Sequence, residues 1–284
     1  MYEIIEKNKL APDIFQFKVK APEIAAKAQP GHFLILRAVE TAERVPLTIA
    51  DYDREEGTID MVVQRVGFSS KQICSFKEGE EFLDVVAPLG NAIETTGYER
   101  VLCIAGGLGA APLYPKVKDL VDHGAEVTTI LGAQSAEKLI LEDEFADLSA
   151  DLYFATDDGS RGTEGFVTDV LSELLAEDDN YDLVIAIGPM IMMEAVAKVT
   201  AEYDLKTIVS LNTLMVDGTG MCGGCRVTVG GETKFACVDG PAFDGHQVDF
   251  EEQKRRKRFY EDQEEKIEEH HFGGEGCRAA RETD

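Results

Sequence analysis

The chain is poor in basic residues and contains no tryptophan. It has 28 Lys and Arg residues against 54 Asp and Glu residues among 284 positions, which gives a formal net charge of −26. This imbalance argues against a nucleic-acid partner, because a phosphate backbone would be repelled. It does not exclude a dinucleotide, which is bound by local backbone amides. The absence of tryptophan excludes no function.

Long apolar runs and export signals are also missing. No apolar stretch reaches the roughly 20 residues that cross a membrane, and the N-terminal MYEIIEKNKL lacks the apolar core of a signal peptide. We therefore expect a cytoplasmic protein without membrane association. In that compartment, six cysteines are interpreted as ligands and buried thiols rather than as disulfides. The length allows two domains with separate cores.

The pattern of apolar residues changes along the chain. Residues 1–97 are predicted to form short strands punctuated by Gly and Pro, typical of a small antiparallel β-barrel. Residues 98–205 alternate apolar strands with amphipathic helices, which indicates a parallel sheet covered on both faces. Residues 206–243 hold the cysteine-rich segment, and residues 244–284 form a charged tail. The predicted fold is therefore an all-β domain followed by an α/β domain and a small subdomain.

Three turns in the second domain fall where apolar strands end. GGLGAAP stands between a strand and a helix, where glycine amides and a helix N-terminus can approach a pyrophosphate. TDDGSRG and AIGPM follow later strands and so lie on the same sheet edge. Such turns also occur for packing alone, and the first loop by itself leaves both interpretations open. The candidate nucleotide-binding residues are Gly106, Gly107, Gly109, Ala110, Pro112, Asp157, Asp158, Gly188 and Pro189.

Two stretches of the first domain, ERVPLTIADY and QRVGFSSK, contain candidate flavin-binding residues. Arg44 can pair with a phosphate, and Thr48 can donate a hydrogen bond to a flavin edge. Gly67, Ser69 and Ser70 can supply a turn and amides to a pyrophosphate. From these residues alone, a solvated Arg44 and a simple helix cap explain the pattern better than a ligand does.

The stretch VDGTGMCGGC, followed by KFACVDG, spaces three cysteines as C-x2-C and a later Cys. Cys222, Cys225 and Cys237 supply three thiolates where a tetrahedral zinc site or an iron–sulfur site normally has four ligands. The spacing alone leaves zinc and iron–sulfur equally open. Cys74 and Cys103 are expected in the core.

The order of these pieces resembles that of the ferredoxin-NADP reductase superfamily: a barrel with an Arg…Pro-x-Thr motif, a GG-x-G-x-x-P nucleotide domain and a cysteine cluster. More narrowly, it resembles the branch that contains the iron–sulfur electron-transfer subunit of dihydroorotate dehydrogenase. Within that branch it is similar to the small subunits of electron-bifurcating NADH-dependent reduced ferredoxin:NADP+ oxidoreductases. The resemblance covers about residues 1–242.

This resemblance implies an oxidoreductase subunit that holds FAD and a [2Fe–2S] cluster and that reacts with NAD(H). Thr48 is implied to tune the flavin near N5. The superfamily's Arg-x-Tyr-Ser is replaced by Arg44 followed by VPLT, so Arg44 and a backbone amide both remain open as the group that meets the FAD phosphates. The implied FAD contacts are Val45, Pro46, Leu47, Thr48, Val62, Val63, Gln64, Ser69 and Ser70.

The resemblance also supplies a fourth cluster ligand. Cluster-bearing relatives have C-x4-C-x2-C and then a distant Cys, and overlaying that spacing puts Asp217 at the first position. Together with the flavin and nucleotide motifs, the pattern favours iron–sulfur over zinc. We therefore expect a [2Fe–2S] cluster held by Asp217, Cys222, Cys225 and Cys237.

A larger iron–sulfur flavoprotein subunit is the implied partner in a heterodimer, with ferredoxin reached through that subunit. The charged tail, in which Phe259 and Tyr260 follow a basic block, is expected to bind this partner because it has little apolar surface to bury against its own domains. Two alternatives stay open: an electron-transfer subunit of a dihydroorotate dehydrogenase, hydrogenase or sulfite reductase, and a non-catalytic scaffold.

NAD(H) is expected to be preferred over NADP(H). Recognition of a 2′-phosphate usually requires a nearby Arg, and the stretch GAQSAEKLILEDEF beyond the second strand of the nucleotide domain contains none. The alternative is that Lys138, or Arg161 from the next loop, supplies the charge.

Overall fold

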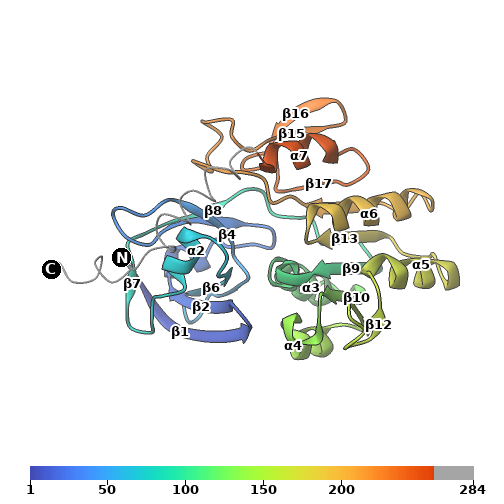
Figure 1. Ribbon diagram of the computed structural model, residues 1–284, viewed down its shortest axis with the longest axis horizontal. Helices are drawn as coiled ribbons and strands as arrows, with labels where there is room; N and C mark the ends of the chain where they lie inside the picture. Colours follow the sequence, from blue (N-terminus) through green and yellow to red (C-terminus); the bar gives the residue numbers. More distant parts are fainter. Residues whose placement is uncertain (259–284) are drawn as a thin grey trace.

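Two antiparallel sheets build the first domain of the computed structural model, which describes residues 1–258 (Figure 1). The five-stranded sheet consists, in spatial order, of β5 (Asp51–Asp53), β6 (Thr58–Gln64), β2 (Ile14–Lys20), β1 (Tyr2–Ala11) and β7 (Glu81–Phe82). The three-stranded sheet consists of β4 (Val45–Thr48), β3 (Phe33–Arg37) and β8 (Asp84–Leu89). Two short helices, α1 (Pro22–Ala25) and α2 (Phe68–Ile73), connect strands.

Alternating side chains explain why these segments form strands with one buried face. In β2, Phe17 and Val19 are buried while Lys18 and Lys20 point outward. The inward side chains of both sheets meet in one core, in which Phe17 packs edge-on against Phe82. The predicted antiparallel architecture is therefore confirmed, as two sheets around a shared core.

A seven-stranded sheet forms the second domain. Its order is β12 (Thr163–Glu164), β11 (Asp151–Thr156), β10 (Glu126–Ala133), β9 (Arg100–Gly106), β13 (Leu183–Ile187), β14 (Thr207–Ser210) and β17 (Ala242–Asp244). All strand pairs are parallel except β14 with β17. The predicted parallel sheet is confirmed.

Helices cover both faces of this sheet, which is why its central strands are apolar throughout (Figure 1). Val101 and Cys103 of β9 join the core beneath α3 (Ala110–Asp122) and α4 (Glu142–Leu148). Leu102 and Ile104 join the core beneath α5 (Val167–Glu177) and α6 (Met190–Ala201). The strand order reverses between β9 and β13, and open α/β sheets bind ligands at such a reversal, beyond the carboxyl ends of the strands.

The cysteine-rich segment begins and ends on this sheet. Residues 207–210, which the sequence analysis placed in the cysteine segment, form β14 beside β13, and β17 pairs back onto β14. Between them, β15 (Arg226–Val229) and β16 (Glu232–Phe235) form a separate hairpin. The hairpin lies above the two domains in Figure 1.

The expectation that the charged tail has little apolar surface to bury against its own domains is wrong for its first part. Residues 250–257 form α7 (Phe250–Lys257), in which Phe250 and Gln253 are buried. The expectation rested on the density of charged residues and overlooked two apolar side chains, Val248 and Phe250, which are buried in the core beneath α6. The remaining tail features, Phe259, Tyr260 and Cys277, lie outside the described residues. Within residues 1–258, no helix is both long and apolar enough to cross a membrane.

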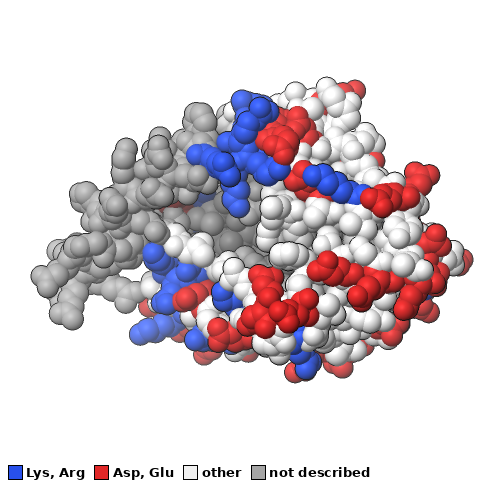
Figure 2. All heavy atoms as spheres, turned by 45° about the vertical axis from the view of Figure 1, so that its right-hand side comes forward, with Lys and Arg blue, Asp and Glu red and all other residues white. Residues whose placement is uncertain are grey.

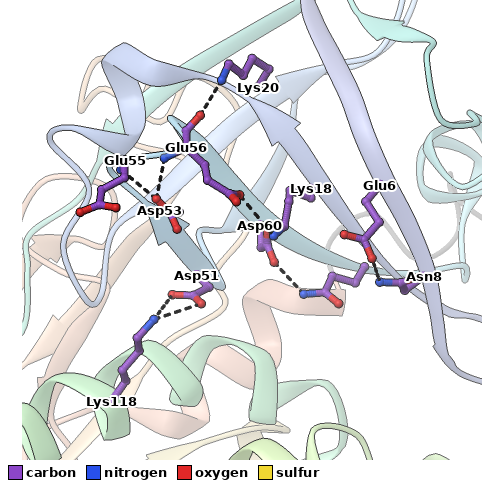
Figure 3. Close-up of polar contacts among 11 residues, drawn as sticks. Glu6, Asn8, Lys18, Lys20, Asp51, Asp53, Glu55, Glu56, Asp60 and Lys118 are labelled. Atoms are coloured by element: carbon purple, nitrogen blue, oxygen red, sulfur yellow. Dashed lines mark hydrogen bonds and ion pairs between the residues drawn. The ribbon is translucent and has the colours of Figure 1, made fainter.

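An ion pair and an apolar contact join the two domains. Lys118 of α3 lies 3.1 Å from Asp51 of β5 (Figure 3). Ala50 and Val62 of the first domain share a core with Ala110 and Ala111 of α3. The start of α3 therefore faces the first domain.

Asp60 lies beside this contact in a row of charged side chains that crosses the five-stranded sheet. Glu6, Lys18, Asp60 and Asp51 occupy directly opposed positions on four adjacent strands (Figure 3). Asp60 is 8% exposed and accepts a hydrogen bond from Gln16. Burial raises its pKa to about 6, and Lys18 only partly offsets this.

This raised pKa predicts that Asp60→Asn stabilises the protein at alkaline pH. Because the pKa of Asp60 is about 6 in the folded state and about 3.9 when unfolded, the stabilisation from its proton is complete below about pH 4 and is lost as the pH rises through 6. Asn is neutral throughout, so at pH 8 the variant should be more stable by about 1–3 kcal/mol.

Urea unfolding from about pH 5 to pH 8 checks this prediction. The advantage of the Asn variant should shrink as the pH falls. Glu55→Gln, which removes an exposed carboxylate from the adjacent turn, is the matched control for a lost negative charge. A stability difference that does not depend on pH would contradict the assignment.

Candidate functional site

The turns after β9 and β13 meet through their backbones at the point where the strand order reverses. A Cβ atom on Gly109 would lie 2.1 Å from the carbonyl oxygen of Ile187, and one on Gly188 would lie 3.0 Å from Cα of Gly106. A side chain at Gly109 would clash with backbone atoms, and one at Gly188 would force its neighbours to shift. Gly106 also abuts Pro189, and Gly107 has a φ of +53°. The structure thus brings together the predicted residues of both turns.

The first turn of α3 carries the other predicted residues of this loop, Ala110 and Pro112. The Pro112 carbonyl accepts a hydrogen bond of 2.7 Å from the ammonium of Lys116. Lys116 is 1% exposed, and burial lowers its pKa to about 8. No ion pair to Lys116 occurs among the described residues. The sequence analysis missed this lysine, although a Lys inside the apolar pattern PLYPKV was visible.

One polar atom near this edge is buried without a partner. The Thr213 hydroxyl, a few residues beyond the carboxyl end of β14, has no hydrogen-bond partner within the described chain. Buried polar atoms are normally satisfied, so an orphaned hydroxyl at a ligand-binding edge fits a site that receives a polar molecule. Sequence reasoning did not single out Thr213.

The two predicted aspartates lie further along the same edge, after β11. Asp158 accepts hydrogen bonds from the amide and the hydroxyl of Ser160, which lower its pKa. The Ser160 hydroxyl in turn accepts from the amide of Ala136, which follows β10. Asp157 and Asp158 therefore belong to the outer part of the edge, two strands from the turn at Gly106.

Both cations considered for recognition of a 2′-phosphate contact neighbouring side chains. The guanidinium of Arg161 lies 3.3 Å from Glu142 and stacks 4.5 Å above the Phe154 ring. The ammonium of Lys138 donates to the Gln134 side chain. Arg161 is therefore paired with a carboxylate, whereas Lys138 has a neutral partner.

The predicted flavin strand, β4, is half-buried along its whole length and pairs with β3, with Thr48 opposite Phe33 and Pro46 opposite Ile35. Of the residues predicted on β6, Val62 and Val63 bury their side chains, so only their backbone is available to a flavin. Gln64 is exposed.

The predicted pyrophosphate turn is a helix cap in this structure. The Ser70 hydroxyl accepts hydrogen bonds from the amides of Gly67 and Val66 at the start of α2. The Ser69 hydroxyl donates a bond of 2.6 Å to Glu43, which draws this turn toward the start of β4. Arg44 is exposed and has no ion-pair partner among the described residues, so its guanidinium is available to an anion.

The four predicted cluster ligands lie in two close pairs. The Cys222 thiol lies 2.9 Å from a carboxylate oxygen of Asp217, and the sulfurs of Cys225 and Cys237 lie 3.2 Å apart. Hydrogen bonds from Cys222 and Thr219 hold the pKa of Asp217 well below its usual range. Burial raises the pKa of the Cys237 thiol to about 12, so a metal ion would have to displace its proton.

This pairing fits a two-iron cluster better than a single zinc ion. Each iron of a [2Fe–2S] cluster takes two protein ligands, whereas zinc needs four donors that converge on one point. Nowhere in residues 1–258 do three or more His, Cys, Asp or Glu side chains converge on one metal position. Gly218, Gly220 and Gly223 adopt positive φ in the loop, which lets its amides turn toward the donors.

The cysteine loop rests against the sheet that holds the expected flavin strand. A Cβ atom on Gly218 would lie 2.9 Å from the Ile35 side chain of β3. Cys225 and Cys237 share a core with Phe33 and Ile35. Since β3 pairs directly with β4, one strand separates the expected flavin strand from the expected cluster.

Comparisons with known families agree with these features. Residues 103–198 match the oxidoreductase NAD-binding domain, and residues 212–249 match the iron-sulfur cluster binding domain of dihydroorotate dehydrogenase B. The chain is 47% identical over 262 residues to the dihydroorotate dehydrogenase B (NAD(+)) electron transfer subunit homolog of Thermotoga maritima, with 92% of each chain covered. It is 33% identical over 251 residues to the electron transfer subunit of Shouchella clausii, covering 84% of this chain and 94% of that one.

Solved structures give the same assignment. The chain is 45% identical to one from a study of flavin-based electron bifurcation in NADH-dependent reduced ferredoxin-NADP oxidoreductase, with a TM-score of 0.91 and coverage of 96% and 98%. Phthalate dioxygenase reductase, at 17% identity and a TM-score of 0.60 over 80% of this chain and 85% of that one, shares the fold. The resemblance expected from the sequence is confirmed, and the chain belongs to the family of dihydroorotate dehydrogenase B electron transfer subunits and their homologues.

Proposed function

We propose that this chain is an FAD- and [2Fe–2S]-containing electron-transfer subunit that reacts with NAD(H) in NADH-dependent reduced ferredoxin-NADP oxidoreduction. The observation that carries the proposal is the contact of the Gly218 loop with β3. Because β3 pairs with β4, this contact leaves one strand between β4 and the loop that carries the Asp217–Cys222 and Cys225–Cys237 pairs. A bound flavin exchanges hydride with a nicotinamide and single electrons with an iron–sulfur cluster.

The residues of the chain hold and orient these groups, and no general base is required. We assign the FAD to β4, the backbone at Val62 and Val63, and the turn at Gly67, with Thr48 as the hydrogen-bond donor that tunes the flavin. The tight backbone contact between the turns at Gly106 and Gly188 provides the floor for the nicotinamide dinucleotide. Asp217 with Cys222, and Cys225 with Cys237, would each hold one iron.

The functional division that we propose follows the sequence expectation. Residues 1–97 bind FAD, residues 98–205 bind NAD(H), and residues 206–243 bind the cluster, with β14 and β17 anchoring the last segment in the nucleotide-binding sheet. Residues 244–284 contribute α7, and we assign the remainder to partner binding.

The partner that we propose is a larger iron–sulfur flavoprotein subunit, with ferredoxin reached through it. Three apolar side chains of the cysteine segment are exposed: Val216 at 57%, Met221 at 86% and Val238 at 41%. Exposed apolar groups gathered on one segment are typical of a surface that another protein covers. An electron-transfer subunit of a dihydroorotate dehydrogenase is the second candidate, favoured by the family match of residues 212–249; Asp217 in place of a cysteine favours the first.

The proposal predicts about one FAD and one [2Fe–2S] cluster per purified chain. The visible spectrum should show oxidised flavin overlapped by iron–sulfur absorption, and chemical analysis should find iron and labile sulfide in equal amounts. The measurement is made on anaerobically purified full-length protein. Stoichiometric zinc without labile sulfide would show instead that the thiols hold a structural metal.

A second prediction concerns Asp217. Asp217→Cys should keep the cluster but change its reduction potential, because thiolate and carboxylate donate differently to iron. Asp217→Ala should make the cluster labile, with a loss of about tenfold or more in iron retention during chelator challenge. Asp239→Asn is the control, because Asp239 is a carboxylate of the same segment that contacts the amide of Phe235 rather than a thiol. An unchanged electron paramagnetic resonance spectrum in the Ala variant would remove Asp217 from the ligand set.

A third prediction is a preference for NADH over NADPH of about tenfold or more in kcat/KM for reduction of the bound flavin. The reason is that Arg161 is held by Glu142 and is not available to a 2′-phosphate. Glu142→Gln should therefore raise kcat/KM for NADPH while leaving that for NADH nearly unchanged. Stopped-flow flavin reduction with both cofactors measures this, and faster reduction of the wild-type protein by NADPH would refute the preference.

A further inference from the structure

Helix α7 lies along the hairpin of β15 and β16 and contacts β15 at successive turns. The amide of Asp249 donates to the carbonyl of Thr228, and Glu252 accepts from the amide of the same residue. The next residue, Gln253, donates from its side chain to the carbonyl of Arg226 at 3.1 Å. These bonds fix the register of α7 on β15.

The last of these contacts reaches the loop between two of the thiols. The Arg256 guanidinium donates a hydrogen bond of 2.8 Å to the carbonyl of Gly224, and the Arg226 guanidinium lies 3.5 Å from the carbonyl of Gly223. Two cations therefore meet two consecutive carbonyls of the turn Cys222–Cys225. Charge-assisted hydrogen bonds of this kind are stronger than neutral ones.

Because the peptide bond is planar, a hydrogen bond to a carbonyl on one side of the loop also fixes the direction of the amide on the other side. In a trans peptide the N–H points opposite to the C=O. The peptide whose Gly223 carbonyl faces Arg226 has its Gly224 amide directed at the Cys222 sulfur, at 3.3 Å. By the same geometry, the bond from Arg256 to Gly224 turns the Cys225 amide to the face of the loop away from the helix.

The helix itself is held firmly enough to act as a support. Phe250 is buried in the same core as Cys225 and Cys237. Lys254 is 2.9 Å from Glu194 of α6, a carboxylate whose side chain is only 13% exposed. Glu194 thus ties α7 to the nucleotide-binding domain, and the position of Arg256 is set by packing rather than by the loop alone.

We propose that Arg256 is a positioning residue for the iron–sulfur site, which holds the turn Cys222–Cys225 and raises the reduction potential of the cluster bound there. The inference rests on the proposed function, because it concerns that cluster. One-electron reduction adds a negative charge to an already anionic group, so a fixed guanidinium and oriented amides favour the reduced form. In a chain of net charge −26, such a local cation opposes the surrounding negative field.

Neighbouring cations on α7 and at its C-terminal end provide the control. Arg255, Lys257 and Arg258 are exposed, and Figure 2 shows basic side chains gathered at the level of α7. Of these, Arg255 is adjacent to Arg256 in sequence and makes no hydrogen bond or ion pair with the cysteine loop among the described residues. Arg255→Gln therefore removes the same charge from the same helix without breaking the bond to Gly224.

The test is a redox titration of the cluster in full-length protein, followed by electron paramagnetic resonance. Arg256→Gln should lower the potential by about 59 mV, which corresponds to a tenfold change in a one-electron equilibrium. Arg255→Gln should lower it by less than a third of that amount. Arg256→Lys keeps the charge and should recover at least half of the loss. If Arg256→Gln loses its cluster while Arg255→Gln keeps it, the positioning role is supported. The effect on the reduction potential is then measured on Arg256→Lys.

Two results would overturn the inference alone: a wild-type potential in Arg256→Gln, or equal shifts in the two Gln variants, with normal iron and sulfide in both. A wild-type chain without labile sulfide would instead overturn the proposed function, and this inference with it. Iron and sulfide analysis of each sample before titration separates these cases.

Discussion

The antiparallel pairing of β17 with β14 is the constraint on which the arrangement of the candidate site depends. The chain leaves the nucleotide-binding sheet after β14 and returns to it at β17, on the adjacent position. The amide of Leu211 also bonds to the carbonyl of Pro241, so the base of the excursion is closed just beyond the strands. The segment between these points, which includes the β15–β16 hairpin, is anchored at both ends to a rigid parallel sheet. This is the kind of support that a precise ligand set needs.

That anchoring determines which parts of the molecule the excursion touches. On one side Gly218 meets Ile35 of the flavin-domain sheet, and on the other α7 follows β15 to the turn before Cys225. Gly218 has a φ of +73°, so its missing side chain permits both the turn and the close approach. The close packing of the cysteine loop against β3, the neighbour of the expected flavin strand, thus depends on Gly218 lying against Ile35 and Leu89.

The fold was predictable from the sequence where apolar residues recur with a regular spacing. It was not predictable where one pairing or one buried side chain determines the position of a segment. The alternation in β2 and the apolar runs in β9 and β13 indicated the two kinds of sheet correctly, because burial on one face or two leaves different patterns. The edge strand β17 is only three residues long and carries no period, so its pairing with β14 had no sequence signature. The anchoring role of Phe250 was likewise hidden in a run of charges.

The candidate site likewise contains residues that the sequence predicted and residues that it did not. The spacing of the cysteines indicated a metal site, but the proximity of Asp217 to Cys222 came only from resemblance, since an aspartate five residues from a cysteine has no intrinsic meaning. Lys116 and Thr213 were missed because each is defined by what surrounds it in three dimensions: a helix face packed on β9, and a hydroxyl left without a partner. Lys116 is a buried cation whose hydrogen bond goes to a neutral carbonyl, and Thr213 is a buried hydroxyl without a partner in the described chain. Such groups cost free energy when no ion or hydrogen-bond partner satisfies them.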